Sequence, residues 1–445
     1  MLESFFKPKK AVVIGASRKK GKIGNVIFSN LLDKKFEAEC VNPKAEKILG
    51  RRCYANVSEM RGKADLAVIA TPAKTVPKIL DECGKKGIRN IIIVSAGFKE
   101  TGNLKLMDEL KKPIKKYSLR VLGPNCLGTF DAYSGIDTLF MLKSRLHRPE
   151  KGSISLISQS GALGAAVLDL ASKKGIGFSK FVSYGNAIDI DETDLLKEAA
   201  KDKNTKVICM YIEQIKRGQE FIRTAKKIKK PIIFLKGGVT EAGNKAAMSH
   251  TGSLAGSAGI YAGVLRQAGC IQVKDIREMF IIADTLSKVK SLPKGNRVQV
   301  ITNGGGYGIN ATDLLEKAGL VMRKPSRNCM MRLKGFPEMI NISNPLDILG
   351  DSTNERYKKA IKACLKDKNN DMLLVLVLTQ VPLIDEGITE AFKASAKPII
   401  ATVTGRGLAE KITKKLKNKG IPCFEEVNDA VIAIKGIVRQ KELQK

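Results

Sequence analysis

The sequence has no tryptophan and only two histidines, His147 and His250, among 445 residues. Aromatic residues make up 5% of the chain, so its cores must be built from Ile, Leu, Val and Ala, the composition typical of parallel sheets buried on both faces. Its nine cysteines include no C-x-x-C pair, and with two histidines they provide no plausible structural zinc set. We therefore expect reduced, mostly buried thiols and no metal site.

Long hydrophobic runs are also missing. The longest, Met372–Leu378, is far below the ~18 residues that a membrane span requires, and the N-terminal MLESFFKPKK lacks the apolar core of a signal peptide. These absences predict a cytoplasmic protein.

Positive charge dominates the sequence, which contains 78 Lys and Arg residues but only 44 Asp and Glu residues, for a net charge of +34. The lysine pairs are spread along the chain, and aromatic residues are not interleaved with them as a base-stacking surface would require. This pattern favours a solvated basic surface that attracts anionic ligands or an acidic subunit. Weak nonspecific binding of nucleic acid is the alternative.

Short apolar runs alternate with helical patterns, which indicates doubly wound parallel sheets. The length suggests about three domains at ~150 residues each, and we expect bounds of 1–145, 146–291 and 292–445. Residues 154–178 and 298–322 align without a gap at an offset of 144, each as an apolar strand, a glycine-containing turn and a helix. This similarity predicts that the second and third domains are duplicates.

A strand-to-helix turn near the N-terminus offers backbone amides to a diphosphate. It reads VVIGASRKKGKIGN from residue 12, with Gly15, Ala16 and Ser17 after the strand, and its spacing is not G-x-G-x-x-G. Lys44 stands near the end of the next strand, where a nicotinamide dinucleotide site would have an acidic group. A lysine suits the ribose 3′-phosphate of coenzyme A, although an ordinary tight turn remains the alternative.

Three later features could support phosphoryl chemistry. The turn SQSGALG (158–164) could bind a phosphate or simply cap a helix. Glu213 follows an apolar strand, at the sheet edge where α/β proteins bind ligands, and could orient an imidazole; alternatively it is a surface residue. His250, in KAAMSHTGSLAG, could carry a phosphoryl group as a phosphoramidate or be an incidental surface residue. Residues 238–245 lack the G-K-[ST] of a Walker motif, so a nucleotide would bind elsewhere.

Nine ordered motifs along nearly the whole chain resemble the α subunit of ADP-forming acetyl-CoA synthetases, a branch of the succinyl-CoA synthetase superfamily. Among them are VVIGASRKKGKIG, RVLGPNCLG, YIEQIKRG and MSHTGSLAGS. The resemblance implies an α/β fold: a Rossmann-like CoA-binding domain followed by two flavodoxin-like, succinyl-CoA synthetase-like domains. It also implies an acid–thiol ligase, which interconverts acyl-CoA, ADP and phosphate with free acid, ATP and CoA through an acyl phosphate and a phosphohistidine.

The same resemblance implies roles for individual residues. His250 would be the phosphorylated nucleophile and Glu213 the carboxylate that orients it. The other expected site residues are Ser160, Gly161 and Ala162 for phosphate; Gly15, Ala16, Ser17, Lys44, Thr71, Pro72, Ser95 and Gly97 for coenzyme A; and Asn125 and Cys126 at the acyl thioester. Cys126 is expected to be structural, because coenzyme A supplies the reacting thiol.

Partners follow from the resemblance as well. Fused family members continue into an ATP-grasp region, so a separate ATP-grasp β subunit is expected to bind ADP or ATP and Mg²⁺, in an α2β2 assembly. Two other functions stay open on the sequence: a catalytically silent CoA-sensing module and a nicotinamide dehydrogenase.

Overall fold

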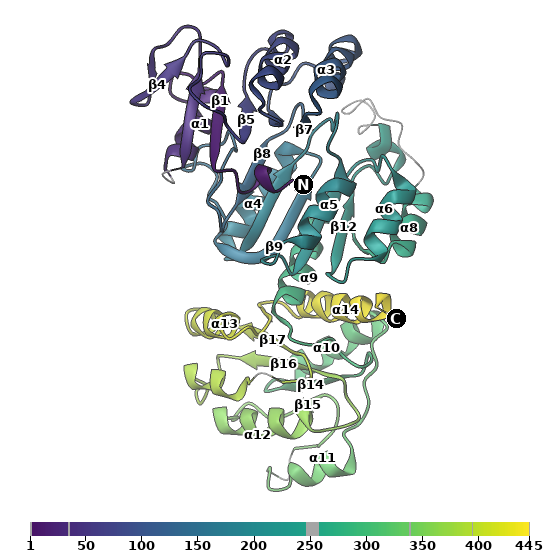
Figure 1. Ribbon diagram of the computed structural model, residues 1–445. Helices are drawn as coiled ribbons and strands as arrows, with labels where there is room; N and C mark the ends of the chain where they lie inside the picture. Colours follow the sequence, from purple (N-terminus) through teal and green to yellow (C-terminus); the bar gives the residue numbers. More distant parts are fainter. Residues whose placement is uncertain (1, 34–35, 246–257, 338–339, 394, 445) are drawn as a thin grey trace. The chain divides into compact units, whose positions relative to one another are not determined.

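The computed structural model describes residues 2–33, 36–245, 258–337, 340–393 and 395–444 (Figure 1). His250 lies outside these residues. The chain forms two compact units, Met1–Ile276 and Arg277–Lys445. The domain bounds given above stay a prediction.

The first unit contains two sheets, and the first of them has seven strands in the order β3-β4-β2-β1-β5-β6-β7. All neighbours are parallel except β3 and β4. The strands β4-β2-β1-β5-β6-β7 follow the Rossmann order 3-2-1-4-5-6, which confirms the Rossmann-like fold. The strands are β1 (Lys10–Ile14), β2 (Glu37–Val41), β3 (Lys47–Ile48), β4 (Arg51–Tyr54), β5 (Leu66–Ile69), β6 (Asn90–Ile93) and β7 (Arg120–Leu122), with helices α1 (Ile23–Asp33), α2 (Val76–Lys86) and α3 (Leu104–Tyr117).

The second sheet has six strands in the order β13-β12-β11-β9-β10-β8. Its five parallel strands follow the flavodoxin order 2-1-3-4-5, and β8 is added antiparallel to β10 at one edge. The strands are β8 (Gly128–Asp131), β9 (Lys151–Ser158), β10 (Phe178–Ser183), β11 (Val207–Ile212), β12 (Ile232–Lys236) and β13 (Ile271–Val273), with helices α4 (Gly161–Lys173), α5 (Glu192–Lys201), α6 (Gly218–Lys226) and α8 (Ala258–Gln267).

The second unit contains a five-stranded sheet in the order β15-β14-β16-β17-β18, again a flavodoxin order. Its helix α10 (Gly305–Lys317) begins and ends 144 residues after α4, so the structure confirms the duplication predicted from the sequence. The remaining elements are β14 (Val298–Thr302), β15 (Leu346–Asp347), β16 (Met372–Leu378), β17 (Ile399–Thr404), β18 (Cys423–Phe424), α9 (Ile276–Lys288), α11 (Arg327–Arg332), α12 (Asn354–Leu365), α13 (Leu408–Asn418) and α14 (Val427–Leu443).

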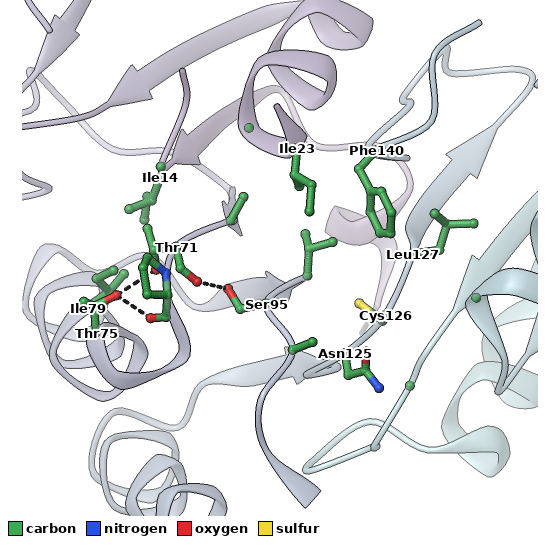
Figure 2. Close-up of a pocket in the computed structure, with 18 of the residues that line it drawn as sticks. Ile14, Ile23, Thr71, Thr75, Ile79, Ser95, Asn125, Cys126, Leu127 and Phe140 are labelled. Carbon is green, nitrogen blue, oxygen red and sulfur yellow. Dashed lines mark hydrogen bonds between the residues drawn. The ribbon is translucent and has the colours of Figure 1, made fainter. Parts of the chain in front are cut away.

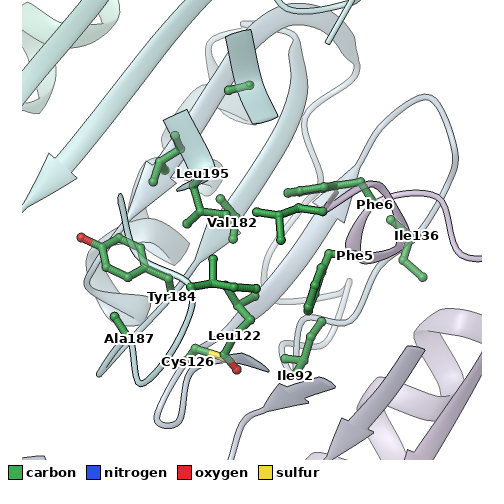
Figure 3. Packing of buried hydrophobic residues seen from close by; sticks show 14 of the residues in the cluster. Phe5, Phe6, Ile92, Leu122, Cys126, Ile136, Val182, Tyr184, Ala187 and Leu195 are labelled. Carbon is green, nitrogen blue, oxygen red and sulfur yellow. The ribbon is translucent and has the colours of Figure 1, made fainter. Parts of the chain in front are cut away.

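The two sheets of the first unit share one hydrophobic cluster. Figure 3 shows Phe5, Ile92 and Leu122, which come from the N-terminal segment and the first sheet, packed with Val182 from β10 of the second sheet and with Tyr184 just after β10. All five side chains are at most 2% exposed. The two halves of this unit are therefore fixed relative to each other by burial of apolar surface.

All nine cysteines are buried and none forms a disulfide, as expected from the composition. Across the described ranges, no helix is both long and apolar enough to cross a membrane. The same part of the chain contains no group of three or more His, Cys, Asp or Glu residues that could hold a metal ion.

Candidate active site

A cavity of about 1460 Å³ lies in the first unit, and both of its sheets contribute to the wall. From the first sheet come Gly15 after β1 and Thr71 after β5; from the second come Gln159 after β9 and Glu213 after β11. These are the carboxyl ends of the strands at which each sheet reverses its strand order, the usual ligand site of α/β proteins. The ligand sites of the two sheets therefore lie in one shared cavity.

The turn after β1 requires glycine at two positions. Gly15 has a φ of +91°, and a Cβ atom there would lie 2.5 Å from the Ala70 carbonyl oxygen. A Cβ atom on Gly24 would lie 2.0 Å from the Gly15 carbonyl oxygen. Because glycine permits both close approaches, the amino end of α1, with Ile23 and Gly24, forms part of the cavity wall.

The loop after β2 places a lysine on the same wall. The Asn42 side-chain amide donates to the Ala16 carbonyl oxygen at 2.6 Å, and its Oδ1 accepts from the Lys44 amide at 2.8 Å. Lys44 is exposed on the cavity wall. Four further lysines belong to this wall on the side of the first sheet: Lys19, Lys22, Lys78 and Lys99. This end of the cavity suits a ligand with several phosphate groups.

The middle of the cavity combines a fixed polar side with an apolar one. Ser95 donates from its hydroxyl to the Thr71 carbonyl oxygen at 2.6 Å, and the Asn125 amide donates to the Ser95 carbonyl oxygen at 3.0 Å. Asn125 has a φ of +57°, a left-handed conformation that asparagine tolerates better than most residues. Figure 2 shows these residues together with the apolar side chains Ile23, Leu127 and Phe140, which also line the cavity.

Cys126 lies next to Asn125, but its thiol is not available for chemistry. The side chain is 3% exposed, and its Sγ contacts the Ile93 carbonyl oxygen at 3.4 Å. Burial raises the pKa of the Cys126 thiol to about 12, so the thiol stays protonated near neutral pH. This environment agrees with a structural role.

The turn 158–164 begins α4 at the other end of the cavity. Ser160 is the N-cap, and its hydroxyl accepts from the Leu163 amide at 3.3 Å. A Cβ atom on Gly164 would lie 2.7 Å from the Phe181 ring, so the helix can pack this closely against the sheet only with glycine there. The helix-cap interpretation is confirmed, and it is compatible with an anion site because Ser160, Gly161 and Ala162 line the cavity.

The side chain of Gln159 holds the backbone of Glu213 beside this turn. Gln159 Oε1 accepts from the Glu213 amide at 2.9 Å and from the Gln214 amide at 3.1 Å. The hydroxyl of Tyr184 lies 3.3 Å from the same oxygen. Glu213 itself is 8% exposed, so the alternative interpretation as a surface residue is wrong. The residue before the N-cap of α4 thus ties the backbone of Glu213 and Gln214 to the start of this helix.

The surroundings of Glu213 are mostly buried and polar. The Tyr211 hydroxyl lies 3.5 Å from Glu213 Oε1, and burial raises the pKa of this phenol to about 12. Burial also lowers the pKa of Lys236, while the charge of Glu213 acts in the opposite direction. The Lys236 ammonium lies 4.5 Å from the ring centre of Tyr261. A carboxylate in such surroundings interacts strongly with any cation or hydrogen-bond donor that reaches it.

The structure brings most of the expected site residues to the cavity wall. The wall contains Gly15, Ser17, Lys44, Thr71, Pro72, Ser95, Asn125, Cys126, Ser160, Gly161, Ala162 and Glu213. Ala16 and Gly97 lie outside it, and His250 lies outside the described residues. The sequence analysis missed other wall residues: Gln159, Tyr184, Glu192, Lys216 and Phe140. For Gln159, its place within the predicted turn could have been a signal.

Comparisons with known proteins agree with this arrangement. A CoA-binding domain model matches residues 9–131, and a succinyl-CoA ligase-like flavodoxin domain model matches residues 151–286. The chain is similar to the α subunit of ADP-forming acetate–CoA ligase II from Pyrococcus furiosus, with 38% identity over 99% of this chain and 98% of that subunit. It is equally similar to ADP-forming acetate–CoA ligase I of Archaeoglobus fulgidus, at 38% identity over 99% of this chain, but spans only 64% of that longer protein.

A solved structure shows the same fold over the full length. It is the dinucleotide-forming acetyl-coenzyme A synthetase 1 of Ca. Korarchaeum cryptofilum in complex with phosphate and ADP. The TM-score is 0.92 at 35% identity, with 100% of this chain and 97% of that chain covered.

Proposed function

The chain belongs to the family of ADP-forming acetate–CoA ligases, and from this premise we propose that it is the α subunit of an ADP-forming acyl-CoA synthetase. The reaction converts acyl-CoA, phosphate and ADP into free acid, CoA and ATP, and it is reversible. One observation carries the proposal: a single cavity connects a lysine-lined, glycine-containing turn with a helix N-terminus next to a buried carboxylate. A thioester and a phosphate can meet in such a cavity.

Coenzyme A is proposed to bind along the first sheet. Gly15, Ser17 and Lys44 would hold its phosphates, while Thr71 and Ser95 would line the channel for pantetheine. Ile23, Leu127 and Phe140, which line the same cavity, would contact the two methyl groups of the pantoyl unit. Ala16 would contribute to the turn through the backbone, since its carbonyl oxygen already accepts from Asn42.

The chemistry is proposed to take place at the second sheet. Inorganic phosphate, held by the amides and hydroxyl of residues 160–162, attacks the thioester carbonyl; a C–O bond forms, the C–S bond breaks, and CoA leaves as a thiolate that takes up a proton. His250 then attacks the phosphorus of the acyl phosphate: an N–P bond forms, the P–O bond to the acyl oxygen breaks, and the acid leaves as a carboxylate. Glu213 would accept a hydrogen bond from the N–H of the other imidazole nitrogen and stabilise the positive charge that develops on the ring.

We assign the nucleotide step to a partner subunit. An ATP-grasp β subunit would bind ADP and Mg²⁺ and accept the phosphoryl group from His250, in an α2β2 assembly. The lengths of the relatives support this division, because the chain matches 98% of a protein named as an α subunit but 64% of one named as a whole ligase.

The proposal is tested by phosphate labelling of the purified chain. Incubation with radiolabelled phosphate and acetyl-, isobutyryl- or phenylacetyl-CoA should give an acid-labile, base-stable label with at least one thioester. His250→Ala should lose the label, whereas His147→Ala should keep it. His147 is the matched control, since it is the other histidine of the sequence and lies exposed outside the cavity wall.

Two results would contradict the proposal. Label that persists in His250→Ala would remove this residue from the mechanism. Absence of label from the parent chain with all three thioesters, together with tight CoA binding, would instead indicate the catalytically silent CoA-sensing module.

A further inference from the structure

A second carboxyl group, that of Glu192, lies in the wall of the cavity. Glu192 is the first residue of α5, directly after the N-cap Asp191, whose carboxylate accepts from the Thr193 and Asp194 amides at 2.9 and 3.2 Å. The Glu192 side chain is 0% exposed. Acidic residues are common in the first turn of a helix at the protein surface, but they are almost never fully buried unless a partner compensates their charge.

The two oxygens of Glu192 have different environments. Oε1 accepts from the Lys216 amide at 2.7 Å, which ties α5 to the loop that begins with Glu213. Oε2 is buried and has no hydrogen-bond partner among the described residues. A buried polar atom without a partner costs about 1–3 kcal/mol, and an ionised one costs more. A proton on Oε2, with an acceptor in the cavity, removes this cost.

Charged and titratable groups face Glu192 from four segments. Burial raises its pKa to about 7, and the charge of Asp191 adds to this effect, whereas Lys216 acts in the opposite direction. Tyr184, in the segment after β10, has its pKa raised by burial and then by the charges of Glu192 and Glu213. Burial also raises the pKa of Tyr261 on α8, with a further contribution from Glu192.

Hydrogen bonds also relate Glu192 to the turn 158–164. The Tyr184 hydroxyl lies 3.3 Å from Gln159 Oε1, and Gln159 directly precedes Ser160. Gln159 Oε1 accepts from the Glu213 and Gln214 amides, and Glu192 Oε1 accepts from the Lys216 amide two residues further along. Gln159 and Glu192 are therefore bound to the same short loop, and both belong to the cavity wall together with Tyr184 and Ser160.

We propose that Glu192 binds phosphate in its protonated form: its carboxyl group, fully buried in the structure described, rotates toward the cavity, and Oε2–H donates a hydrogen bond to an oxygen of inorganic phosphate held at residues 160–162, while Oε1 stays on the Lys216 amide. This inference rests on the proposed function, because it assigns the phosphate step to that end of the cavity. A neutral carboxyl group can donate to an anion, whereas an ionised one repels it. The site thus loses phosphate as Glu192 ionises.

The test is equilibrium dialysis of the full-length chain against radiolabelled inorganic phosphate between pH 6 and pH 8. Glu192→Gln keeps an acceptor for the Lys216 amide and a neutral donor, and it cannot ionise. Phosphate itself titrates in this range, but the ratio of the dissociation constants of parent and Glu192→Gln cancels that contribution. From a pKa of about 7, this ratio should rise about tenfold between pH 6 and pH 8.

Two further variants separate a binding role from a structural one. Glu192→Met has neither donor nor acceptor and should weaken phosphate binding about tenfold or more at pH 6. Glu198→Gln removes a charge from the same helix outside the cavity wall and should leave the pH profile of the parent unchanged.

Failure of this inference can be distinguished from failure of the proposed function. Parallel pH profiles of the parent and Glu192→Gln, in a chain that still becomes labelled at His250, would overturn the role of Glu192 alone. Absence of phosphate binding by the parent at every pH, together with absence of label, would overturn both.

Discussion

Replacement of Gln159 by leucine tests whether one side-chain oxygen positions the carboxylate of Glu213. Two backbone amides, those of Glu213 and Gln214, donate to Gln159 Oε1 at 2.9 and 3.1 Å. Because backbone amides can only donate, these contacts identify the accepting atom as oxygen. Leucine has a similar volume but no acceptor, so Gln159→Leu leaves both amides without a partner while the packing is largely preserved.

The expected cost follows from the number of amides that lose their partner. Each buried amide left unpaired costs about 1–3 kcal/mol, and the lower value applies here because the turn is only partly buried. The two together give about 2 kcal/mol for local opening of the segment. This cost corresponds to an increase of about 30-fold in hydrogen exchange at the two amides.

The measurement is hydrogen–deuterium exchange of the peptide that contains residues 213 and 214. Gln159→Glu is the matched control, since its carboxylate keeps an acceptor for both amides and should retain most of the protection. We also expect slower labelling of His250 in Gln159→Leu than in the parent. Equal protection of the two amides in Gln159→Leu and the parent would refute the argument that this side chain holds Glu213.

Two other predictions concern the two ends of the cavity. Lys44→Ala should weaken binding of CoA more than binding of dephospho-CoA, measured by calorimetry, because the proposed partner of Lys44 is the 3′-phosphate that dephospho-CoA lacks; equal losses for both ligands would contradict this pairing. Ionisation of Glu192 should lower the free energy of unfolding of the parent protein as the pH rises. Its folded pKa of about 7 lies above the ordinary value of 4.5, so the folded state holds the proton more tightly; the stabilisation is fully present below pH 4.5 and falls until pH 7 is passed. Denaturant unfolding should show about 2 kcal/mol more loss between pH 5 and pH 8 for the parent than for Glu192→Gln; parallel curves would contradict the raised pKa.

The sequence predicted the long, periodic elements well, because their hydrophobic patterns depend on local repetition. The strand, turn and helix expected within residues 154–178 occur as β9 and α4, and those expected within residues 298–322 occur as β14 and α10. The two duplicated helices even match residue for residue. In contrast, no pattern in the sequence predicts β3, β4 or β8, because the pairing of these strands depends on partners elsewhere in the chain.

Site residues were predictable only where they belong to a sequence pattern formed by their immediate neighbours. The turn at Ser160 and the strand end at Glu213 have recognisable patterns. Glu192 has none: in DETD it is an ordinary acidic residue of a first helical turn, and only the tertiary fold brings the Lys216 amide to it and removes it from water. The acceptor role of Gln159 depends in the same way on β11, which lies about 50 residues later in the chain.

The crossover strand β8 has a consequence for protein engineering. Although it follows β7 closely in the chain, β8 pairs with β10, and its Asp131 forms a buried ion pair with Lys180, which also contacts Asp202 at 3.3 Å. A gene fragment that ended after β8 would encode Asp131 without its partner Lys180. It would also leave the backbone groups of β8 without their partner strand β10, and an unpaired strand promotes self-association. Chimeras intended to exchange substrate preference between relatives should therefore have their crossover point near residue 276 and keep everything before it in one piece.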